Sequence, residues 1–366
     1  QFCHQFVCQF AADVSGQPMI RRQVRQQSGN GGALVGRGHQ HGAVYGDALS
    51  PGAVTGQRGA QHQAAEAVGH EGDRFCAVQA IEHALELEVP ERAQIIRIIC
   101  GELNRISSHL LWLGTFVLDL GGFTPFLYGF DDREKILDIL DSITGSRLTY
   151  CYGRFGGVTM DVDDVFLRRT ADFCDYFKTR LSEYHELVTG NVIYQHRTKN
   201  VGVIGTELIQ DYALSGPVLR AAGVAQDVRK DEPYGGYERF DFDVPIGERG
   251  GDCFDRHTVR MEEMVQSMRI IEQALACIPE GPIMAPKAPK RFRPPAGDYY
   301  FAVESARGHF GIFITSDGSD VPVRNKLRTP SFVNVSTMPI VLPGTMLADT
   351  VAVLGSIDIV VPEIDR

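Results

Sequence analysis

Apolar residues recur every three or four positions in several long segments after residue 80, which is the spacing of one buried face of an α-helix. The longest such stripe contains Ile95, Ile98, Ile99, Leu103, Ile106, Leu110 and Leu113. Pro90 suits the start of this helix, because its missing N–H loses no partner there, and Gly121 and Gly122 suit its end. The pattern therefore predicts a long helix between Pro90 and Gly121.

Further helices are predicted from the same kind of pattern. One covers residues 130–143, where Asp131 and Glu134 have the spacing of a capping box. Another runs through residues 163–191 behind an acidic start and stops at a Gly–Asn pair. The last runs through residues 255–281 and stops at a proline. Long helices of this kind predict a bundle core.

The C-terminal part of the chain changes character. After a connector rich in Pro, Lys and Arg, apolar and polar residues alternate on both sides of Arg307 and Gly308, which predicts a β-hairpin. Residues 345–366 read as a short helix followed by a buried extended C-terminus. Together with the bundle, these elements predict an α+β fold that is mainly α, with small β-hairpin elements.

Residues 1–80 do not read like residues 81–366. They contain no Lys, two Leu and one Ile, and they are rich in Gln, Gly, His, Ala and Arg. Neither the helical nor the strand period is sustained. Because such a segment can bury little apolar surface, we expect it to be disordered or weakly packed. The sequence thus predicts an aberrant segment over 1–80 and a folded domain over 81–366.

Composition and charge exclude some classes of function. The chain has 366 residues, 43% of them hydrophobic and 22% charged, which is typical of a globular protein with a sizeable core. Its formal net charge of −10 argues against sequence-independent binding of nucleic acid. Residues 1–20 lack the basic start and apolar core of a secretory signal. Residues 95–120 carry Arg97, Glu102 and Arg105, too many charges for a lipid-facing span.

Metal and nucleotide sites have little support in the residue spacing. None of the eight cysteines forms a CxxC pair, so we expect reduced core thiols in a cytoplasmic protein rather than a zinc or iron–sulfur site. Glycine-rich spots lack the spacing of phosphate-binding loops and read as turns. The histidines after residue 180 have no HExxH or HxxxH partner, which favours structural roles; they are His185, His196, His257 and His309.

One charged cluster surrounds the start of the last long helix. Its members are Asp252, Asp255, Arg256, Arg260, Glu262 and Glu263. The arginines are four residues apart and so share a helix face, while the acidic residues suit the positive end of the helix. We interpret this cluster as helix capping and ion pairing with neighbouring helices rather than as a catalytic site.

Asp119 lies at the C-terminal end of an apolar helix, where the helix dipole disfavours a carboxylate. Thr115 comes one turn earlier on the same face, and Leu111 extends that face. Two interpretations fit: a Thr that bonds back to its own helix beside an Asp near the helix end, or a mostly apolar pocket with few polar groups. The local pattern alone favours the first.

Five segments of the chain carry a family resemblance in one register. They are residues 88–126, 132–158, 240–264, 294–319 and 347–366. They resemble the D subunit of bacterial NADH-quinone oxidoreductase, the hydrogenase-like large subunit in the peripheral arm of respiratory complex I. The resemblance implies a fold like the large subunit of nickel–iron hydrogenases, a long-helix bundle with small β elements. Those hydrogenases bind metal through two CxxC pairs, which this chain lacks, so the resemblance implies a cavity that holds a quinone head group and no metal.

The resemblance also implies roles for individual residues. Asp119 matches the family's aspartate that hydrogen-bonds a quinone-site histidine and relays protons. The positions that match the pocket wall are Leu111, Thr115, Leu127 and Val360. His109 lies on the same helix as Asp119, without a matched role in binding.

Cofactors and partners follow from the resemblance in the same way. Members of the family bind no cofactor of their own; quinone is the substrate, and NADH, FMN and the iron–sulfur clusters are bound by partner subunits. The implied partners are the B subunit with the terminal cluster, the C and I subunits, and the membrane-embedded H subunit. The implied location is the cytoplasmic side of the cell inner membrane, as a peripheral component of a proton pump, and the isolated chain is expected to be inactive.

The N-terminal part departs from the family pattern. The family carries sequences of the types QHPSTHG, GYLHRGTEKL and LPYTDRLDY there, which supply the histidine and tyrosine that hold the quinone carbonyls. None occurs in residues 1–80. We therefore hypothesise that residues 1–80 are a frameshifted reading. The alternatives are a structural or assembly protein with a defective quinone site, and a component of a membrane-bound hydrogenase, against which the missing CxxC pairs argue.

Overall fold

The computed structural model describes residues 71–366, except 149, 287, 289–291 and 366. Residues 1–70, which make up most of the predicted aberrant segment, lie outside the described residues, so their frameshifted origin stays a prediction. The predicted boundary at residue 80 falls inside the first described helix, α3 (Glu71–Ala84).

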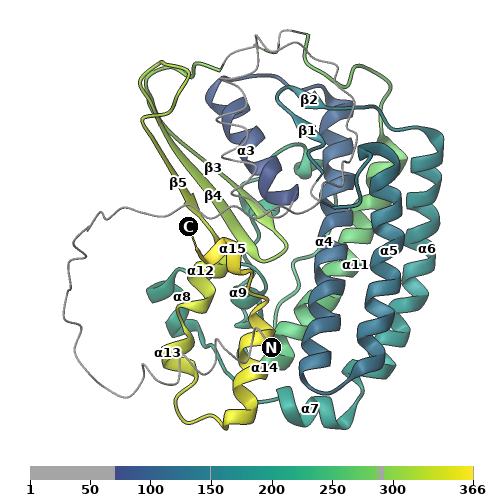
Figure 1. The fold of residues 1–366 in the computed structure, drawn as a ribbon, viewed down its shortest axis with the longest axis vertical. Coiled ribbons are helices and arrows are strands. Elements are labelled where there is room, and N and C mark those ends of the chain that lie inside the picture. The colour runs from purple at the N-terminus through teal and green to yellow at the C-terminus, as the bar shows by residue number, and fades with distance from the viewer. Residues whose placement is uncertain (1–70, 149, 287, 289–291, 366) are drawn as a thin grey trace, which may run out of the picture. The chain divides into compact units, whose positions relative to one another are not determined.

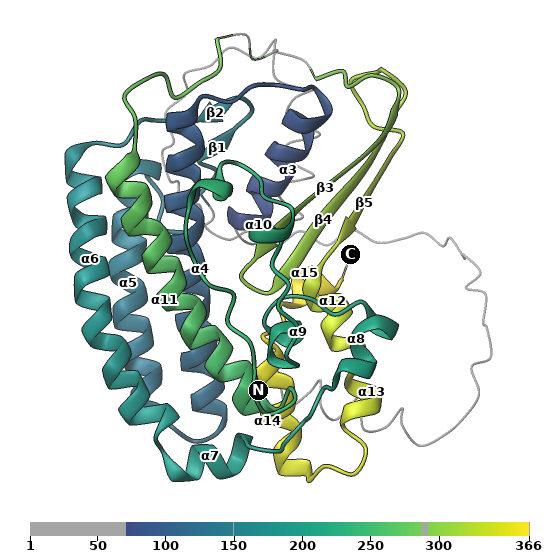
Figure 2. The same ribbon diagram turned by 180° about the vertical axis from the view of Figure 1, so that it is seen from behind.

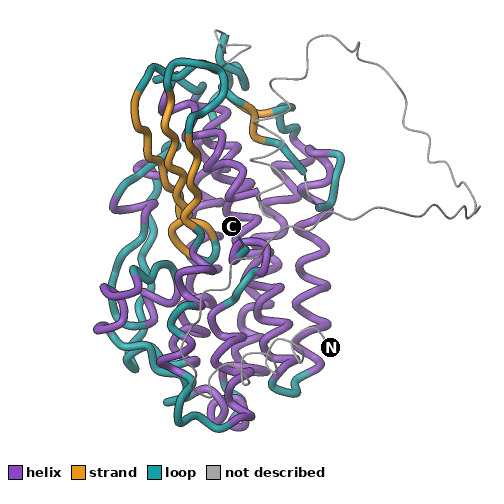
Figure 3. Tube along the Cα trace, turned by 60° about the vertical axis from the view of Figure 1, so that its left-hand side comes forward, coloured by secondary structure: helices purple, strands orange, loops and turns teal. Residues whose placement is uncertain are grey.

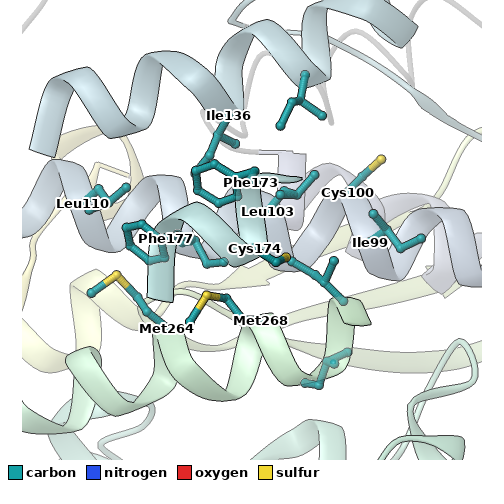
Figure 4. Packing of buried hydrophobic residues seen from close by; sticks show 14 of the residues in the cluster. Ile99, Cys100, Leu103, Leu110, Ile136, Phe173, Cys174, Phe177, Met264 and Met268 are labelled. Carbon is teal, nitrogen blue, oxygen red and sulfur yellow. The ribbon is translucent and has the colours of Figure 1, made fainter. Parts of the chain in front are cut away.

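A helical bundle forms the core of the described chain. Long helices α4 (Glu91–Asp119), α5 (Phe123–Thr144), α6 (Asp164–Tyr184) and α11 (Cys253–Cys277) lie side by side (Figure 1). Buried Ile, Leu, Phe and Met side chains from these helices interlock, as the Phe173 and Phe177 rings of α6 do among their neighbours (Figure 4). The predicted bundle and the predicted mainly α fold class are therefore confirmed.

The start of α5 differs from the prediction. The helix begins at Phe123 after Gly122 as its N-cap, so the predicted capping box of Asp131 and Glu134 is wrong. Both residues lie inside the helix, where Asp131 forms an exposed ion pair with Lys135. The apolar run after Gly122 is helical because it packs on α4. The residue pattern of α5 does not reveal this packing.

The ends of the other long helices follow the prediction closely. α4 starts after Pro90, and its end leads to Gly121 with a left-handed φ of 96°. α6 is capped by the Asp163 side chain, and it continues as a π-helical turn, η1 (His185–Thr189), before Gly190.

A three-stranded antiparallel sheet lies beside the bundle, with its strands gathered together (Figure 3). β3 (Gly297–Ser305) and β4 (Gly308–Ser316) form the predicted hairpin, and β5 (Arg324–Arg328) adds an edge strand that the sequence did not predict. Helix α3 covers one face of this sheet, and Cys76 and Ala80 pack there against Phe310. A second, two-stranded sheet pairs β1 (Gly153–Arg154) with β2 (Gly157–Val158).

Short helices connect these layers. They are α7 (Val192–Thr198), α8 (Thr206–Tyr212), α9 (Pro217–Ala221), α10 (Val228–Asp231), the 3-10 helix η2 (Tyr237–Arg239), α12 (Pro330–Val335) and α13 (Met338–Val341). Of these, α9 packs on α11 and α10 packs on β3, so both lie between the bundle and the sheet (Figure 2).

The C-terminus is helical where an extended chain was expected. The predicted short helix is α14 (Leu347–Ile357), and it is followed by α15 (Val361–Ile364) in place of the extended segment. The chain turns between them at Asp358, whose φ is 59°. The carboxylate of Glu363 in α15 is buried and accepts a hydrogen bond from Ser331, which holds this short helix in place.

Two predictions about composition can be compared with the described residues. No helix in the described part of the chain has both the length and the apolarity needed to cross a bilayer. Among the described cysteines, Cys151 and Cys277 are exposed, so the expectation of core thiols is wrong for these two. The buried cysteines of the described residues are Cys76, Cys100, Cys174 and Cys253. The other two, Cys3 and Cys8, lie outside the described residues.

Candidate functional site

The face of α4 that carries Leu111, Thr115 and Asp119 lies at the end of the bundle where α4 turns into α5 (Figure 1). Leu111 is half-buried and Thr115 is exposed. Asp119 is exposed as a residue, but protein atoms partly cover its carboxyl group. The Thr115 hydroxyl donates to the carbonyls of Leu111 and Trp112 at 3.0 and 3.1 Å. The hydroxyl is thus bonded to its own helix, as in the first of the two interpretations from the sequence.

Helix α14 packs against α4 next to Asp119. A Cβ atom placed on Gly355 would lie 2.9 Å from Phe116 Cδ2 and 4.0 Å from Asp119 Oδ2, so only glycine permits this approach. Partial burial raises the pKa of Asp119 above that of an ordinary aspartate. This carboxyl group therefore releases its proton at a higher pH than an ordinary aspartate does.

The last turn of α14 is held by two side chains of the bundle. Trp112 of α4 donates its indole N–H to the carbonyl of Gly355 at 2.8 Å. Arg260 of α11 donates to the carbonyls of Ser356 and Ile357 at 2.7 and 3.1 Å. The Arg260 guanidinium also lies 4.4 Å from the centre of the Trp112 ring, in a cation–π contact.

The two remaining predicted wall residues lie on neighbouring elements. Val360 follows α14, is half-buried, and donates its backbone N–H to Ser331 Oγ at 3.3 Å. Leu127 lies in the first turns of α5 and is 50% exposed. These turns pack closely against α4: a Cβ atom placed on Gly114 would lie 3.4 Å from the Cα of Phe126. The structure thus brings α4, the start of α5 and the end of α14 together, and the roles of the five residues stay predictions.

His109 has a different environment from Asp119. Its Nε2 lies 2.8 Å from Oε2 of Glu263, and both side chains are fully buried. Burial lowers the pKa of His109, against the opposite effect of Glu263. Burial would raise the pKa of Glu263, but Arg220 and His109 hold it well below the ordinary value. This pair belongs to the interior of the bundle.

The His109 pair is part of a buried ion network that the sequence did not predict. Arg220 bonds Glu263 at 2.6 Å and Glu304 at 2.8 Å, which links α11 to β3. Next to it, Arg229 bonds Asp227 at 2.7 Å and also reaches Glu102. The sequence held one indication of this network, because Glu102 lies among the apolar residues that form the buried stripe of α4.

The charged cluster at the start of α11 agrees with the prediction in part. Asp252 caps the helix by accepting from the backbone N–H of Asp255, and Glu263 takes part in the buried ion network. The prediction of ion pairs is corrected for the arginines, which donate to main-chain carbonyls: Arg256 to those of Gly251 and Gly202, and Arg260 to those at the end of α14. The reason is that helix and loop ends present unpaired carbonyls to α11.

Two histidines that are far apart in the sequence are joined by one hydroxyl. Thr189 Oγ1 lies 3.1 Å from Nδ1 of His185 and 2.9 Å from Nε2 of the fully buried His257. His309 lies 2.7 Å from the Tyr300 hydroxyl on the sheet. The described residues gather no group of three or more His, Cys, Asp or Glu side chains that could hold a metal ion.

Two hollows in the described region lie away from Asp119. One, between α4 and β3, is lined in part by Asn104, Arg105 and Glu304. The other is an open groove along α3 and β3, where Tyr299 and Phe301 form part of the wall. The linings of these two hollows include none of the five predicted site residues.

Comparison with known proteins places this geometry in a family. The family model described as "Respiratory-chain NADH dehydrogenase, 49 Kd subunit" matches residues 119–292 and 288–366. The NADH-quinone oxidoreductase D subunit of Syntrophobacter fumaroxidans is 55% identical over 289 residues, which cover 79% of this chain and 77% of the relative. The D subunit of Desulfotalea psychrophila is 53% identical over the same shares. That of Geobacillus kaustophilus is 48% identical over 294 residues, 80% of each chain.

The family model covers the α4–α5 turn and α14, which lie next to Asp119, and it also covers α11. The matches agree with the resemblance that the sequence motifs indicated. The chain therefore belongs to the family of the 49 kDa subunit of respiratory-chain NADH dehydrogenase, which includes the bacterial NADH-quinone oxidoreductase D subunits.

Proposed function

We propose that this chain forms part of the quinone pocket of a proton-translocating NADH:quinone oxidoreductase, beside the terminal iron–sulfur cluster of a neighbouring subunit. Its membership in the family and the names of its relatives support a place in that complex. The observation that carries the pocket proposal is the position of Asp119, a partly buried carboxyl group of raised pKa at the junction of α4 and α14.

The chemistry of quinone reduction fits such a group. Reduction to the quinol takes two electrons and two protons, and each proton must reach a carbonyl oxygen from a positioned donor. Asp119 can act as the proton source for a donor that contacts the quinone. Apolar side chains at Leu111, Leu127 and Val360 would give the head group a wall that excludes water.

The other parts of the reaction belong to partner proteins in this proposal. NADH oxidation, FMN and the iron–sulfur clusters lie on other subunits, and the chain itself binds no cofactor. Its neighbours would be the B subunit with the terminal cluster, the C and I subunits, and the membrane-embedded H subunit. The chain would lie on the cytoplasmic side of the inner membrane as a peripheral component, and it would be inactive when isolated.

Substitution of Asp119 tests the pocket proposal in the assembled complex. If the complex that contains this chain reduces quinone, we expect Asp119→Asn to lower its NADH:quinone reductase activity in membranes by about 100-fold, the range for loss of a positioned proton donor. Electron transfer from NADH to ferricyanide, which bypasses the quinone, should stay unchanged. Asp131→Asn, which removes an exposed carboxylate of α5, is the matched control. Full quinone reductase activity in the Asp119 variant would contradict the proposal.

A second candidate function is that of an assembly protein with a defective quinone site. The alignment with the relative from Syntrophobacter fumaroxidans leaves about a fifth of each chain unmatched. The hypothesis that the site residues of the N-terminal region are replaced by a frameshifted segment rests on the absence of the family's N-terminal sequences from residues 1–80. Normal quinone reductase activity in membranes that carry this chain would contradict the defective-site interpretation.

A further inference from the structure

Arg260 is a buried cation whose bonding partners are unusual. Its side chain is fully buried, and the hydrogen bonds that it donates end on the carbonyls of Arg256, Ser356 and Ile357. Within the described part of the chain, its Nε has no hydrogen-bond partner. Burial lowers the pKa of Arg260 to about 10, against the opposing effect of the Asp358 and Glu263 carboxylates. A buried charge without a bonded counter-ion is costly, so its presence calls for a physical reason.

The end of α14 supplies that reason. The last carbonyls of a helix have no partner within the helix and carry the negative end of its dipole. Trp112 and Arg260 together donate to three of the last carbonyls, those of Gly355, Ser356 and Ile357, of which that of Gly355 also accepts from the N–H of Asp358. The guanidinium also stacks on the indole, so the two side chains act as one cap.

This cap determines where α14 ends relative to α4. With its last turn held on Trp112, Gly355 comes against Phe116 and Asp119. The chain then reverses at Asp358, with its left-handed φ of 59°, and continues to Val360.

We propose that Arg260 is a positioning residue, which fixes the C-terminal turn of α14 against α4 and thereby sets the place of Asp119 relative to Val360. Its role in quinone reduction rests on the proposed function above. The positioning of α14 does not rest on the proposed function, and it is tested separately.

Arg256 provides a matched control. It lies one turn earlier on α11, is also fully buried, and donates to Ser356 Oγ and to the carbonyls of Gly251 and Gly202. It therefore anchors loops and the Ser356 side chain in the last turn of α14, without bonding the last carbonyls of that helix. Arg256→Lys keeps a donor for Ser356 Oγ, so it should lower stability without moving the end of α14.

Trp112 is the only tryptophan in the chain, so its fluorescence reports on this contact in the full-length protein. We expect Arg260→Met to increase acrylamide quenching of Trp112 several-fold and to speed amide hydrogen exchange in α14 by about tenfold, because two charge-assisted carbonyl bonds are lost. Arg260→Lys keeps the charge but not the planar fork, so it should give a smaller change in the same direction. Arg256→Lys should leave both signals within about twofold of wild type.

A third measurement separates positioning from a general loss of stability. The emission of Trp112 is followed against pH, and the part that Asp119→Asn abolishes is assigned to Asp119. In Arg260→Met, the pH midpoint of this part of the emission should fall toward that of an exposed aspartate, because α14 no longer covers the carboxyl group. In Arg256→Lys, the midpoint should stay unchanged.

The outcomes decide the proposal. A folded Arg260→Met chain with wild-type quenching, exchange and Asp119 midpoint overturns it. If Arg260→Met does not fold, the same three measurements on Arg260→Lys decide it. The proposed function is tested separately, by the quinone reductase assay of Asp119→Asn in membranes. Full activity of that variant would count against the quinone pocket and leave the α14 result intact.

Discussion

Single residues in this chain show how burial and partners change a carboxyl group. Asp119 and Glu102 both lie on α4, yet their pKa values are shifted in opposite directions. Asp119 has partial burial and a raised pKa. Glu102 is fully buried, but Arg105 and Arg229 outweigh the effect of burial and lower its pKa to about 2. The first arrangement suits proton transfer, and the second suits a permanent charge that holds elements together.

Glu102 should make the folded state sensitive to acid. Its pKa is 4.5 in the unfolded reference and about 2 when folded, so its contribution is full above pH 4.5 and is lost as pH falls toward 2. We expect Glu102→Gln to lower the free energy of unfolding at pH 7 by about 3 kcal/mol, and the difference from wild type to shrink below pH 4.5. Urea unfolding at several pH values measures this.

Glu134→Gln is the control for that experiment, because Glu134 pairs with Arg147 at the surface with its side chain 51% exposed. Exposed pairs contribute little, so this change should alter stability by less than about 1 kcal/mol at any pH. An equal loss in both variants would show that burial of the ion network is not the cause.

At the scale of elements, the contact between α14 and α4 depends on a residue without a side chain. Gly355→Ala would place a methyl group 2.9 Å from Phe116 Cδ2. We expect a loss of about 1–3 kcal/mol in stability, because a packed interface must open to admit the methyl group. Thermal unfolding measures this.

Gly101→Ala is the opposite case. It lies inside α4, where a new Cβ would be 3.8 Å from the Tyr237 hydroxyl, an ordinary contact. Because alanine favours the helix over glycine, this change should stabilise the chain by up to about 1 kcal/mol. A loss at Gly101 as large as that at Gly355 would contradict the packing argument.

The sequence predicts α4, α6 and α11 well because amphipathic periodicity and caps are local properties. It misses the start of α5 and the strand β5, because both depend on what they pack against: α5 on α4 close to Gly114, and β5 on β4. The helix face of Asp119 was predictable from spacing. The approach of Gly355 to Asp119 was not, because residues more than 230 positions apart must meet.

At the scale of the whole molecule, the buried ion network joins the bundle to the sheet. Glu304 of β3 and Glu263 of α11 share Arg220, and Arg229 reaches Glu102 of α4. No local pattern indicates these pairs, because their members come from distant parts of the chain. Helices α4 and α11 are therefore held beside β3 by charges as well as by apolar packing.

Restoring the reading frame of the N-terminal region tests the frameshift hypothesis. If residues 1–80 are a frameshifted reading, restoring the neighbouring frame of the gene should yield the family's N-terminal sequences and raise quinone reductase activity by about 100-fold, as expected for regained proton donors. The control restores the frame and also carries Asp119→Asn, which should stay at the low level. A neighbouring frame without such sequences would refute the hypothesis.

The Thr189 hydroxyl has a single proton to share between His185 and His257. If the hydroxyl donates to Nε2 of His257, it accepts from the Nδ1–H of His185, and the buried His257 ring carries its hydrogen on Nδ1. If it donates to Nδ1 of His185, Nε2 of His257 must carry the hydrogen and donate to the hydroxyl. The tautomer of the half-buried His185 ring is thus linked to that of a buried ring packed beside Trp112.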